Sequence, residues 1–422
     1  MTSPIEIHQL VDKLFKHEAG KLCAVLTKFF GTQHMELVED VVQDTLADAL
    51  KVWNYKGIPD NPAGWLHTVA KNKALNAIKR ENILKKNTFE IAALHESETT
   101  IDIFFDEEGI ADDLLRMIFT CCHPSLSQDS QVALTLKTLC GFSIPEIARA
   151  FLTTDDTINK RLVRARRTLR EANIPFEVPL GTELDKRLDT VLETIYLLFN
   201  EGYSASKGEQ LIRYELCLEA IRLTSFITDN AHFSQKSNAY ALLALMFLNA
   251  SRFDARQDDE GNIITMEHQN RSLWNKQLID KGLICLEKST ENQTLSVYHI
   301  LAAISATHCI APTYQNTDWK KILSLYDSLL YFDGSPLVIL NRAIALSKVK
   351  GSKEAIKVLK TIENSPVMSK YHLFFSTMGE LYLQTDNAET ATYYFEKAIL
   401  NAPLEKEKQL IINKLKSIKE KG

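Results

Sequence analysis

The side chains best suited to chemistry in this sequence are cations gathered in residues 157–170. This stretch holds six basic residues and no acid. Its apolar residues recur at helical spacing, so the polar residues fall on the opposite, outward face. Guanidinium and ammonium groups neutralise phosphates and bind base edges, so the pattern indicates nucleic-acid binding rather than catalysis. The outward face gathers Asn159, Lys160, Arg161, Arg164, Arg167 and Arg170.

The residues before this stretch predict a helix-turn-helix. Ser143 and Glu146 have the spacing of a capping box, with Pro145 in the first turn of a short helix. A turn follows, and Thr154 caps a second helix with inward apolar residues Ile158, Leu162, Ala165 and Leu169. The second helix of such a unit lies in the major groove of DNA. The alternative, a basic helix packed on an acidic partner, does not explain the capped short first helix.

A second surface that could bind nucleic acid lies nearer the N-terminus. Residues 37–46 predict an amphipathic helix with acids along one edge, and the loop 54–62 leads to a second helix from Gly64. That second helix carries a basic rim with an asparagine, which could bind single-stranded nucleic acid. Trp65 is expected to pack in the core, because its neighbours Leu66, Val69 and Ala70 are apolar.

Charge alternates along the first half of the chain. Residues 65–86 hold six basic residues and one acid, residues 87–113 hold nine acids and no Lys or Arg, and residues 157–170 are basic again. Any one run is most often a solvated helix face, but two basic clusters joined by an acidic segment favour nucleic-acid binding. The net charge of -5 excludes a uniformly basic protein.

Composition sets the fold class and the compartment. Only 15 Gly and 11 Pro in 422 residues favour long helices, so we expect an all-α protein. Seven scattered cysteines without CxxC spacing, no secretory signal and no apolar run long enough for a membrane span predict a cytoplasmic protein.

Two stretches that could hold a metal or a catalytic site do not support one. Cys121-Cys122-His123 has no second ligand pair at zinc-finger spacing, so we expect no metal. Residues 200–204 show no nucleophile–base pairing and no phosphate-binding glycine pattern, so we expect neither an enzyme nor a cofactor. Gly202 is expected to end a helix there.

Residues 181–422 predict successive amphipathic helices, interrupted at 252–266 by a short hairpin or surface loop. Residues 372–403 match the eight signature positions of a tetratricopeptide repeat: Phe375, Met378, Gly379, Tyr382, Ala391, Phe395, Ala398 and Pro403. A weaker copy, with Arg342 at a usually apolar position, lies 36 residues upstream. Such repeats form a concave face that binds protein or peptide. The alternative is two adjacent hairpins without repeat ancestry.

Taken together, these motifs resemble regions 2 and 4 of bacterial RNA polymerase sigma factors of the sigma-70 family. The resemblance rests on Glu39–Asp44, on Trp65-Leu66 with Ala70-Lys71-Asn72, and on the helix-turn-helix that ends at Arg167. The closest subclass is the extracytoplasmic-function type, in the subgroup with a long C-terminal extension containing tetratricopeptide repeats. Residues 119–124, 198–206 and 318–327 carry that wider resemblance.

The resemblance implies a non-enzymatic subunit that joins core RNA polymerase and recognises -35 and -10 promoter elements. It implies polymerase contacts on the β′ clamp helices, made by Asp40, Gln43, Asp44 and Leu46, and on the β flap. Lys71, Asn72 and Lys73 match the loop that takes a flipped -10 base. At the -35 element, Asn159, Lys160 and Arg164 would read bases and Arg161 would contact phosphate, with Arg167 on the same face.

The expected domains are region 2 at 1–86, an acidic linker at 87–112 that follows the nascent-RNA path, region 4 at 113–176, a helical regulatory domain at 181–335 and repeats at 336–422. The rival interpretation is a tetratricopeptide adaptor that is tethered to DNA and does not act with polymerase.

Overall fold

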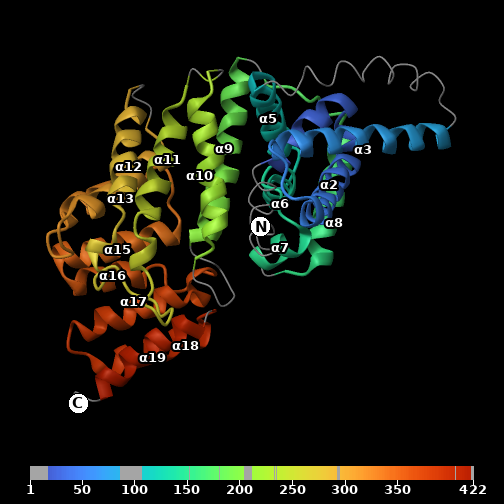
Figure 1. Cartoon of the computed structure of the whole chain (residues 1–422). Coiled ribbons are helices and arrows are strands. Elements are labelled where there is room, and N and C mark those ends of the chain that lie inside the picture. The colour runs from blue at the N-terminus through green and yellow to red at the C-terminus, as the bar shows by residue number, and fades with distance from the viewer. Residues whose placement is uncertain are drawn as a thin grey trace. The chain divides into compact units, whose positions relative to one another are not determined.

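The computed structural model describes residues 18–85, 107–151, 153–179, 181–203, 212–231, 233, 235–291, 295–403 and 405–419. These parts of the chain are helices and connecting loops without a named strand, which confirms the all-α prediction (Figure 1). The interruption at 252–266 contains one isolated antiparallel bridge, between Gln257 and Ile263. The expected acidic linker 87–112 lies almost entirely outside the described residues.

The chain divides into two compact units, residues 1–197 and 198–422. The division falls inside α9 (Thr182–Tyr203), whereas the expected domains are separated between residues 176 and 181. The physical reason is that the two ends of α9 have different partners. Thr194 Oγ1 donates to Gln131 Oε1 at 3.1 Å in the first unit, and Glu201 pairs with Arg213 at 2.7 Å in the second.

The first unit begins with helical residues 18–30 and η1 (Thr32–His34). Its remaining helices are α2 (Met35–Lys56), α3 (Pro62–Lys85), α5 (Glu107–Cys121), α6 (Gln128–Thr138), α7 (Ile144–Ala150) and α8 (Asp155–Glu171). α2 and α3 pack on each other, and the fully buried Trp53 meets the ring of Trp65 edge-on at 5.4 Å. Trp65 therefore packs against the core, as expected from its neighbours.

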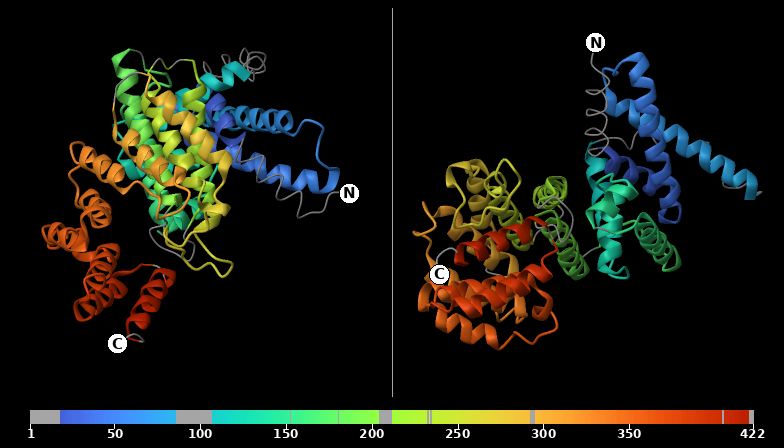
Figure 2. Two further views of the ribbon diagram at one scale, coloured as in Figure 1. Left: turned by 90° about the vertical axis from the view of Figure 1, so that its left-hand side faces the viewer. Right: turned by 90° about the horizontal axis from the view of Figure 1, so that it is seen from below.

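The second unit is a succession of packed helices (Figure 2). Its elements are α10 (Tyr214–Asp229), α11 (Ser237–Ala250), η3 (Phe253–Ala255), η4 (Arg271–Leu273), α12 (Lys276–Ser289), α13 (Val297–Ile310), α14 (Trp319–Leu329), α15 (Pro336–Lys350), α16 (Ser352–Lys360), η5 (Met368–Lys370), α17 (His372–Leu383), α18 (Ala388–Asn401) and α19 (Glu405–Lys419). From α13 to α19 each helix packs on the next along the chain, which is the arrangement of stacked hairpins.

The α17–α18 hairpin packs as a tetratricopeptide unit would. The large positions Phe375, Met378 and Phe395 are buried together. A Cβ at Gly379 would lie 2.9 Å from the Phe395 ring, so only glycine allows the two helices this separation. In the upstream copy, Arg342 pairs with Asp327 at 2.5 Å instead of filling the apolar position. Repeat ancestry itself stays a prediction.

Gly202 was expected to end a helix, and α9 ends one residue after it, at Tyr203. It lies inside the last turn of α9, where a Cβ would come within 2.8 Å of Cys217 Sγ. The glycine therefore serves the close approach of α9 and α10, and the helix continues past it to Tyr203.

We predict that Gly379→Ala lowers the free energy of unfolding by about 1–3 kcal/mol, because the buried Phe395 ring has no room to move. Gly334→Ala is the matched control, since nothing lies within 4 Å of a Cβ there. Urea denaturation of the full chain measures both. Equal stability of the two variants would show that α17 and α18 are not closely packed at Gly379.

Candidate nucleic-acid interface

The helix-turn-helix of the first unit has the caps that its sequence predicts. The Ser143 N–H donates to Glu146 Oε2 at 2.8 Å, and the Glu146 N–H donates back to Ser143 Oγ at 3.3 Å. This reciprocal capping box starts α7. The turn is closed by the Thr153 N–H on Ala148 O at 3.0 Å, and Thr154 Oγ1 then caps α8 by accepting from Thr157 N at 3.2 Å.

α8 buries one apolar stripe and exposes a polar face. The predicted inward residues are at most 1% exposed: Ile158, Leu162, Ala165 and Leu169. On the opposite face four of the five predicted DNA-binding residues are exposed: Asn159, Lys160, Arg164 and Arg167. An exposed cationic face on the second helix is the arrangement that enters a major groove.

The fifth residue, Arg161, lies differently. Its guanidinium is half-buried and pairs with Asp129 of α6 at 2.9 Å, so it braces α8 against the neighbouring helix. Lys160 and Arg167 make pairs within α8, with Asp156 at 2.6 Å and Glu171 at 3.8 Å. These exposed pairs are weak and leave both cations able to exchange to phosphate. Arg164 makes no ion pair with any residue that the structure describes.

Arg166 has a role that the sequence analysis missed. It belongs to the basic run, but it is 7% exposed and its guanidinium pairs with the buried carboxylate of Glu39 in α2. The same carboxylate accepts a hydrogen bond from Thr138 Oγ1 of α6 at 2.7 Å. The sequence spacing could have predicted that Arg166 points inward. Arg166 follows Ile158 by eight residues and Leu162 by four, which places it on the same helix face as the buried stripe.

Further buried polar groups surround this pair. Lys137 is 8% exposed beside Glu39, and burial lowers its pKa while Glu39 opposes that shift. Burial, followed by the nearby Glu39 carboxylate, raises the pKa of the Cys23 thiol, which therefore stays neutral. Glu36 adds a second carboxylate 3.4 Å from Arg166. The cluster therefore joins α2 to α6 and α8 through a buried pair that water screens weakly, with the more exposed Glu36 at its edge.

Two more contacts connect the same parts of the first unit. Lys28 pairs at 3.0 Å with Asp113, a fully buried acid of α5, and burial raises the pKa of that carboxyl. Thr32 Oγ1 donates to Ile174 O at 3.1 Å, just after α8. The region 2-like and region 4-like helices therefore form one body in this structure.

The predicted -10 residues do not lie in a loop, as the family resemblance implied, but on the second helix that the residues from Gly64 predict. Lys71, Asn72 and Lys73 occupy the middle of α3, because Ala70, Ala74 and Leu75 continue its buried stripe and no helix breaker intervenes. Asn72 is exposed. The Lys73 ammonium is tied to α2 by Asp48 Oδ2 at 2.7 Å and Asp44 O at 3.1 Å.

The four predicted polymerase-binding residues lie on α2. Asp40 and Asp44 are exposed, whereas Gln43 and Leu46 are half-buried. Partial burial raises the pKa of Asp40, and the nearby Arg166 opposes that shift. The acidic edge of α2 is thus open next to the charge cluster that contacts α8.

The adjacent cysteines are core residues. Cys121 and Cys122 are both buried, and burial raises the pKa of Cys122 to about 11. No cluster of three or more His, Cys, Asp or Glu side chains suited to a metal occurs among the described residues.

The described helices also include none that is long and apolar enough to cross a membrane.

We predict that Arg166→Met lowers the free energy of unfolding by about 3–5 kcal/mol, because it leaves a buried carboxylate unpaired. The double variant Glu39→Gln/Arg166→Met should cost clearly less than the sum of its two single changes, because it leaves neither charge unpaired. Urea denaturation of the unaltered protein, the two single variants and the double variant completes this double-mutant cycle. Arg167→Met is the exposed control and should change stability by less than about 0.5 kcal/mol. Additive costs in the cycle would contradict the pairing.

Comparison with known proteins agrees with this geometry. Residues 14–83 match the family described as Sigma-70 region 2, and residues 116–169 match Sigma-70, region 4. Residues 187–290, from α9 to α12, match a family of unknown function (DUF6596). The chain is also 34% identical over 377 residues to "Uncharacterized protein R00370" of Rhizobium meliloti (strain 1021), covering 89% of this chain and 88% of that protein. With both regions in order along one chain, the protein belongs to the sigma-70 family.

Proposed function

We propose that this chain is a non-enzymatic RNA polymerase sigma factor of the extracytoplasmic-function type, which recognises a -35/-10 promoter. The observation that carries the proposal is the capped helix-turn-helix with its exposed face on α8, preceded along the chain by a region 2 helix pair. Neither half alone distinguishes a sigma factor from other DNA-binding proteins; the pair in this order does.

At the -35 element, Asn159, Lys160 and Arg164 read base edges from the N-terminal part of α8. Arg161 and Arg167 contact phosphates. Arg161 exchanges its pair with Asp129 for a phosphate, which costs little because the Asp129 side chain is 69% exposed. Arg164 needs no such exchange, so it is the residue whose loss affects recognition most directly.

At the -10 element, the exposed Asn72 contacts a base that has left the duplex, and Lys71 and Lys73 contact its backbone. The acidic edge of α2 binds the β′ clamp helices of core polymerase through Asp40, Gln43, Asp44 and Leu46, and region 4 binds the β flap. Asp48 and Asp44 anchor Lys73, so α2 and α3 present the polymerase and DNA surfaces as one rigid pair.

Promoter geometry requires the first unit to open. The names of the two elements place them about 25 base pairs apart, or roughly 85 Å along B-DNA at 3.4 Å per base pair. Arg166 and Glu39 hold α8 directly against α2. While the Arg166–Glu39 pair is intact, the first unit contacts only one promoter element at a time. Contact with both elements together requires this pair to break. Polymerase and promoter binding supply the required free energy.

The second unit regulates this activity. Its stacked hairpins from α13 to α19 offer the surface for a protein or peptide partner. α9 contributes Thr194 and Arg187 to the first unit and Glu201 to the second, so the chain passes from one unit to the other within one helix. A change in the second unit therefore reaches the promoter-binding unit through α9.

We predict that Arg164→Ala lowers run-off transcription from a -35-dependent promoter by purified core polymerase roughly 5- to 150-fold, since it removes a contact worth about 1–3 kcal/mol. Polymerase binding, measured by co-elution, should be unchanged. Lys186→Ala removes an equally exposed cation from α9 and should transcribe normally. Normal transcription by Arg164→Ala would show that α8 does not read the promoter. Duplex binding without any transcription by the unaltered protein would favour the DNA-tethered adaptor.

We predict that Asn72→Ala spares binding to duplex -35 DNA but impairs opening of the -10 region, because only an extruded base meets this side chain. Permanganate footprinting on linear template measures the opening. A pre-melted bubble template should restore transcription by the variant. Unchanged permanganate reactivity across the -10 region would contradict the role of Asn72.

A further inference from the structure

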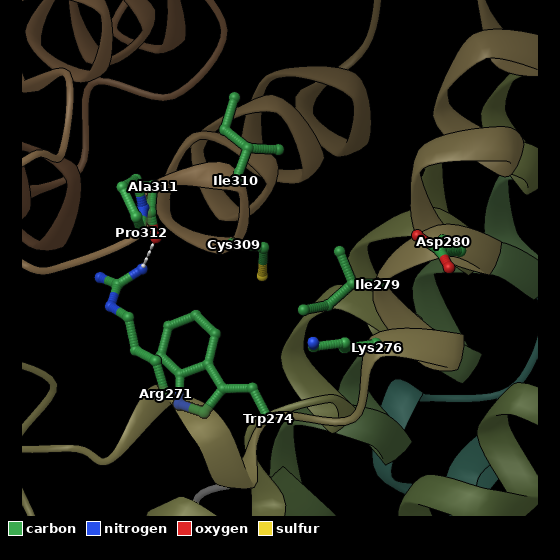
Figure 3. A pocket seen from close by; sticks show the side chains of 9 residues that line it. All are labelled: Arg271, Trp274, Lys276, Ile279, Asp280, Cys309, Ile310, Ala311 and Pro312. Carbon is green, nitrogen blue, oxygen red and sulfur yellow. Dashed lines mark hydrogen bonds between the residues drawn. The ribbon is translucent and has the colours of Figure 1, made fainter.

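The second unit contains a cavity of about 330 Å³ with no assigned role. It lies between the start of α12, the end of α13 and the segment that follows η4 (Figure 3). A volume of about 300 Å³ or more is the size of small-molecule sites in proteins. The cavity falls within the second unit, and none of its lining residues was given a part in promoter or polymerase binding.

The walls of this cavity are held in place by hydrogen bonds. Arg271 Nη1 donates to His308 O at 2.5 Å and to Ala311 O at 2.6 Å, which satisfies carbonyls at the end of α13. The Asn275 N–H donates to Ser251 O at 2.8 Å, and the Asn275 side chain caps α12 by accepting from Leu278 N at 3.1 Å. The site is therefore preformed, which lowers the entropic cost of binding a ligand.

One side of the cavity is apolar. The Trp274 ring, 4% exposed, forms part of its floor, and the Cys309 thiol and the Ile279 side chain point into the same space (Figure 3). Ile310 and Pro312 continue this surface at the rim. These groups suit the flat or branched apolar body of a small molecule.

The other side is cationic. The Lys276 ammonium points into the cavity from the first residue of α12, and it makes no ion pair within the part of the chain that the structure describes (Figure 3). The positive end of the α12 dipole lies at the same place. Asp280, one turn further along α12, is the one acid among the lining residues.

Two arginines behind the Trp274 ring add to this positive charge. The guanidinium groups of Arg271 and Arg252 lie 4.5 Å and 5.7 Å from the ring centroid, and neither pairs with a carboxylate in the described chain. Their effect is visible at His308, where burial and then these two arginines lower the pKa to about 3. The imidazole therefore stays neutral, and the cavity keeps an excess of positive charge.

We propose that this cavity binds a small monocarboxylate with an apolar body, the carboxylate meeting the Lys276 ammonium and the body lying on Trp274 and Ile279. A single carboxylate matches the one unpaired ammonium that points into the cavity. A neutral apolar molecule would make no charge-assisted hydrogen bond with that ammonium. Binding of such an acid does not depend on the sigma-factor role.

The test uses the full chain and two probes of nearly equal shape, phenylacetate and neutral phenylacetamide, in isothermal titration calorimetry. Phenylacetate should bind saturably and about tenfold more tightly than the amide, because it adds one charge-assisted hydrogen bond. Lys276→Glu should remove this preference, and Lys353→Glu, an equal charge change on the exposed face of α16, should keep it. Both sites are exposed, so both variants should fold.

Alkylation of cysteines locates the bound probe. Phenylacetate should slow the reaction of Cys309 with a maleimide and leave Cys285 unaffected, since Cys285 is also half-exposed but does not line the cavity. Equal affinity for acid and amide, unchanged binding by Lys276→Glu, or absence of saturable phenylacetate binding at millimolar concentration would each overturn the proposal. So would equal protection of both thiols.

Discussion

The arrangement of the first unit depends on one buried ion pair, between Glu39 of α2 and Arg166 of α8. Both side chains are almost fully buried, so each charge has lost most of its water. Each is stabilised by the other, with Thr138 and Lys137 beside Glu39 and Glu36 beside Arg166. Removing one partner from such a pair is costly, whereas separating both into water restores their hydration. The contact therefore favours two states, closed with the pair made or open with both charges solvated, and disfavours intermediates.

This constraint connects the fold to the function. The face of α8 that would read DNA and the edge of α2 that would bind polymerase both stay exposed in the closed arrangement. Neither surface has to be uncovered; what changes on opening is the distance between them. The proposed function requires this unit to span two promoter elements, and the form with the pair made would be too short to do so. The chain continues from this unit into the second through α9.

Features that depend on neighbouring residues in the sequence were predicted better than features that depend on distant contact partners. The caps at Ser143 and Thr154 depend on residues three apart, so the helix-turn-helix could be predicted without its surroundings. Arg166 was counted only as a member of the basic run and was given no role, because composition shows a charge but not the distant carboxylate that neutralises it. Gly202 was expected at a helix end, since a glycine required by a neighbouring helix has the same sequence signature as a C-cap. The position of the unit boundary inside α9 likewise depends on contacts with other helices.

The most direct test of this account measures the distance between α2 and α8 by double electron–electron resonance. Spin labels at Tyr55→Cys and Ala172→Cys, both exposed, report it after the half-exposed Cys285 and Cys309 are changed to serine. The account predicts a single short distance in the free protein and a long one in the complex with core polymerase and a -35/-10 promoter. Arg166→Met, which leaves the Glu39 carboxylate buried and unpaired in the closed form, should show the long component without polymerase. The same short distance in the free protein and in the promoter complex would contradict the account.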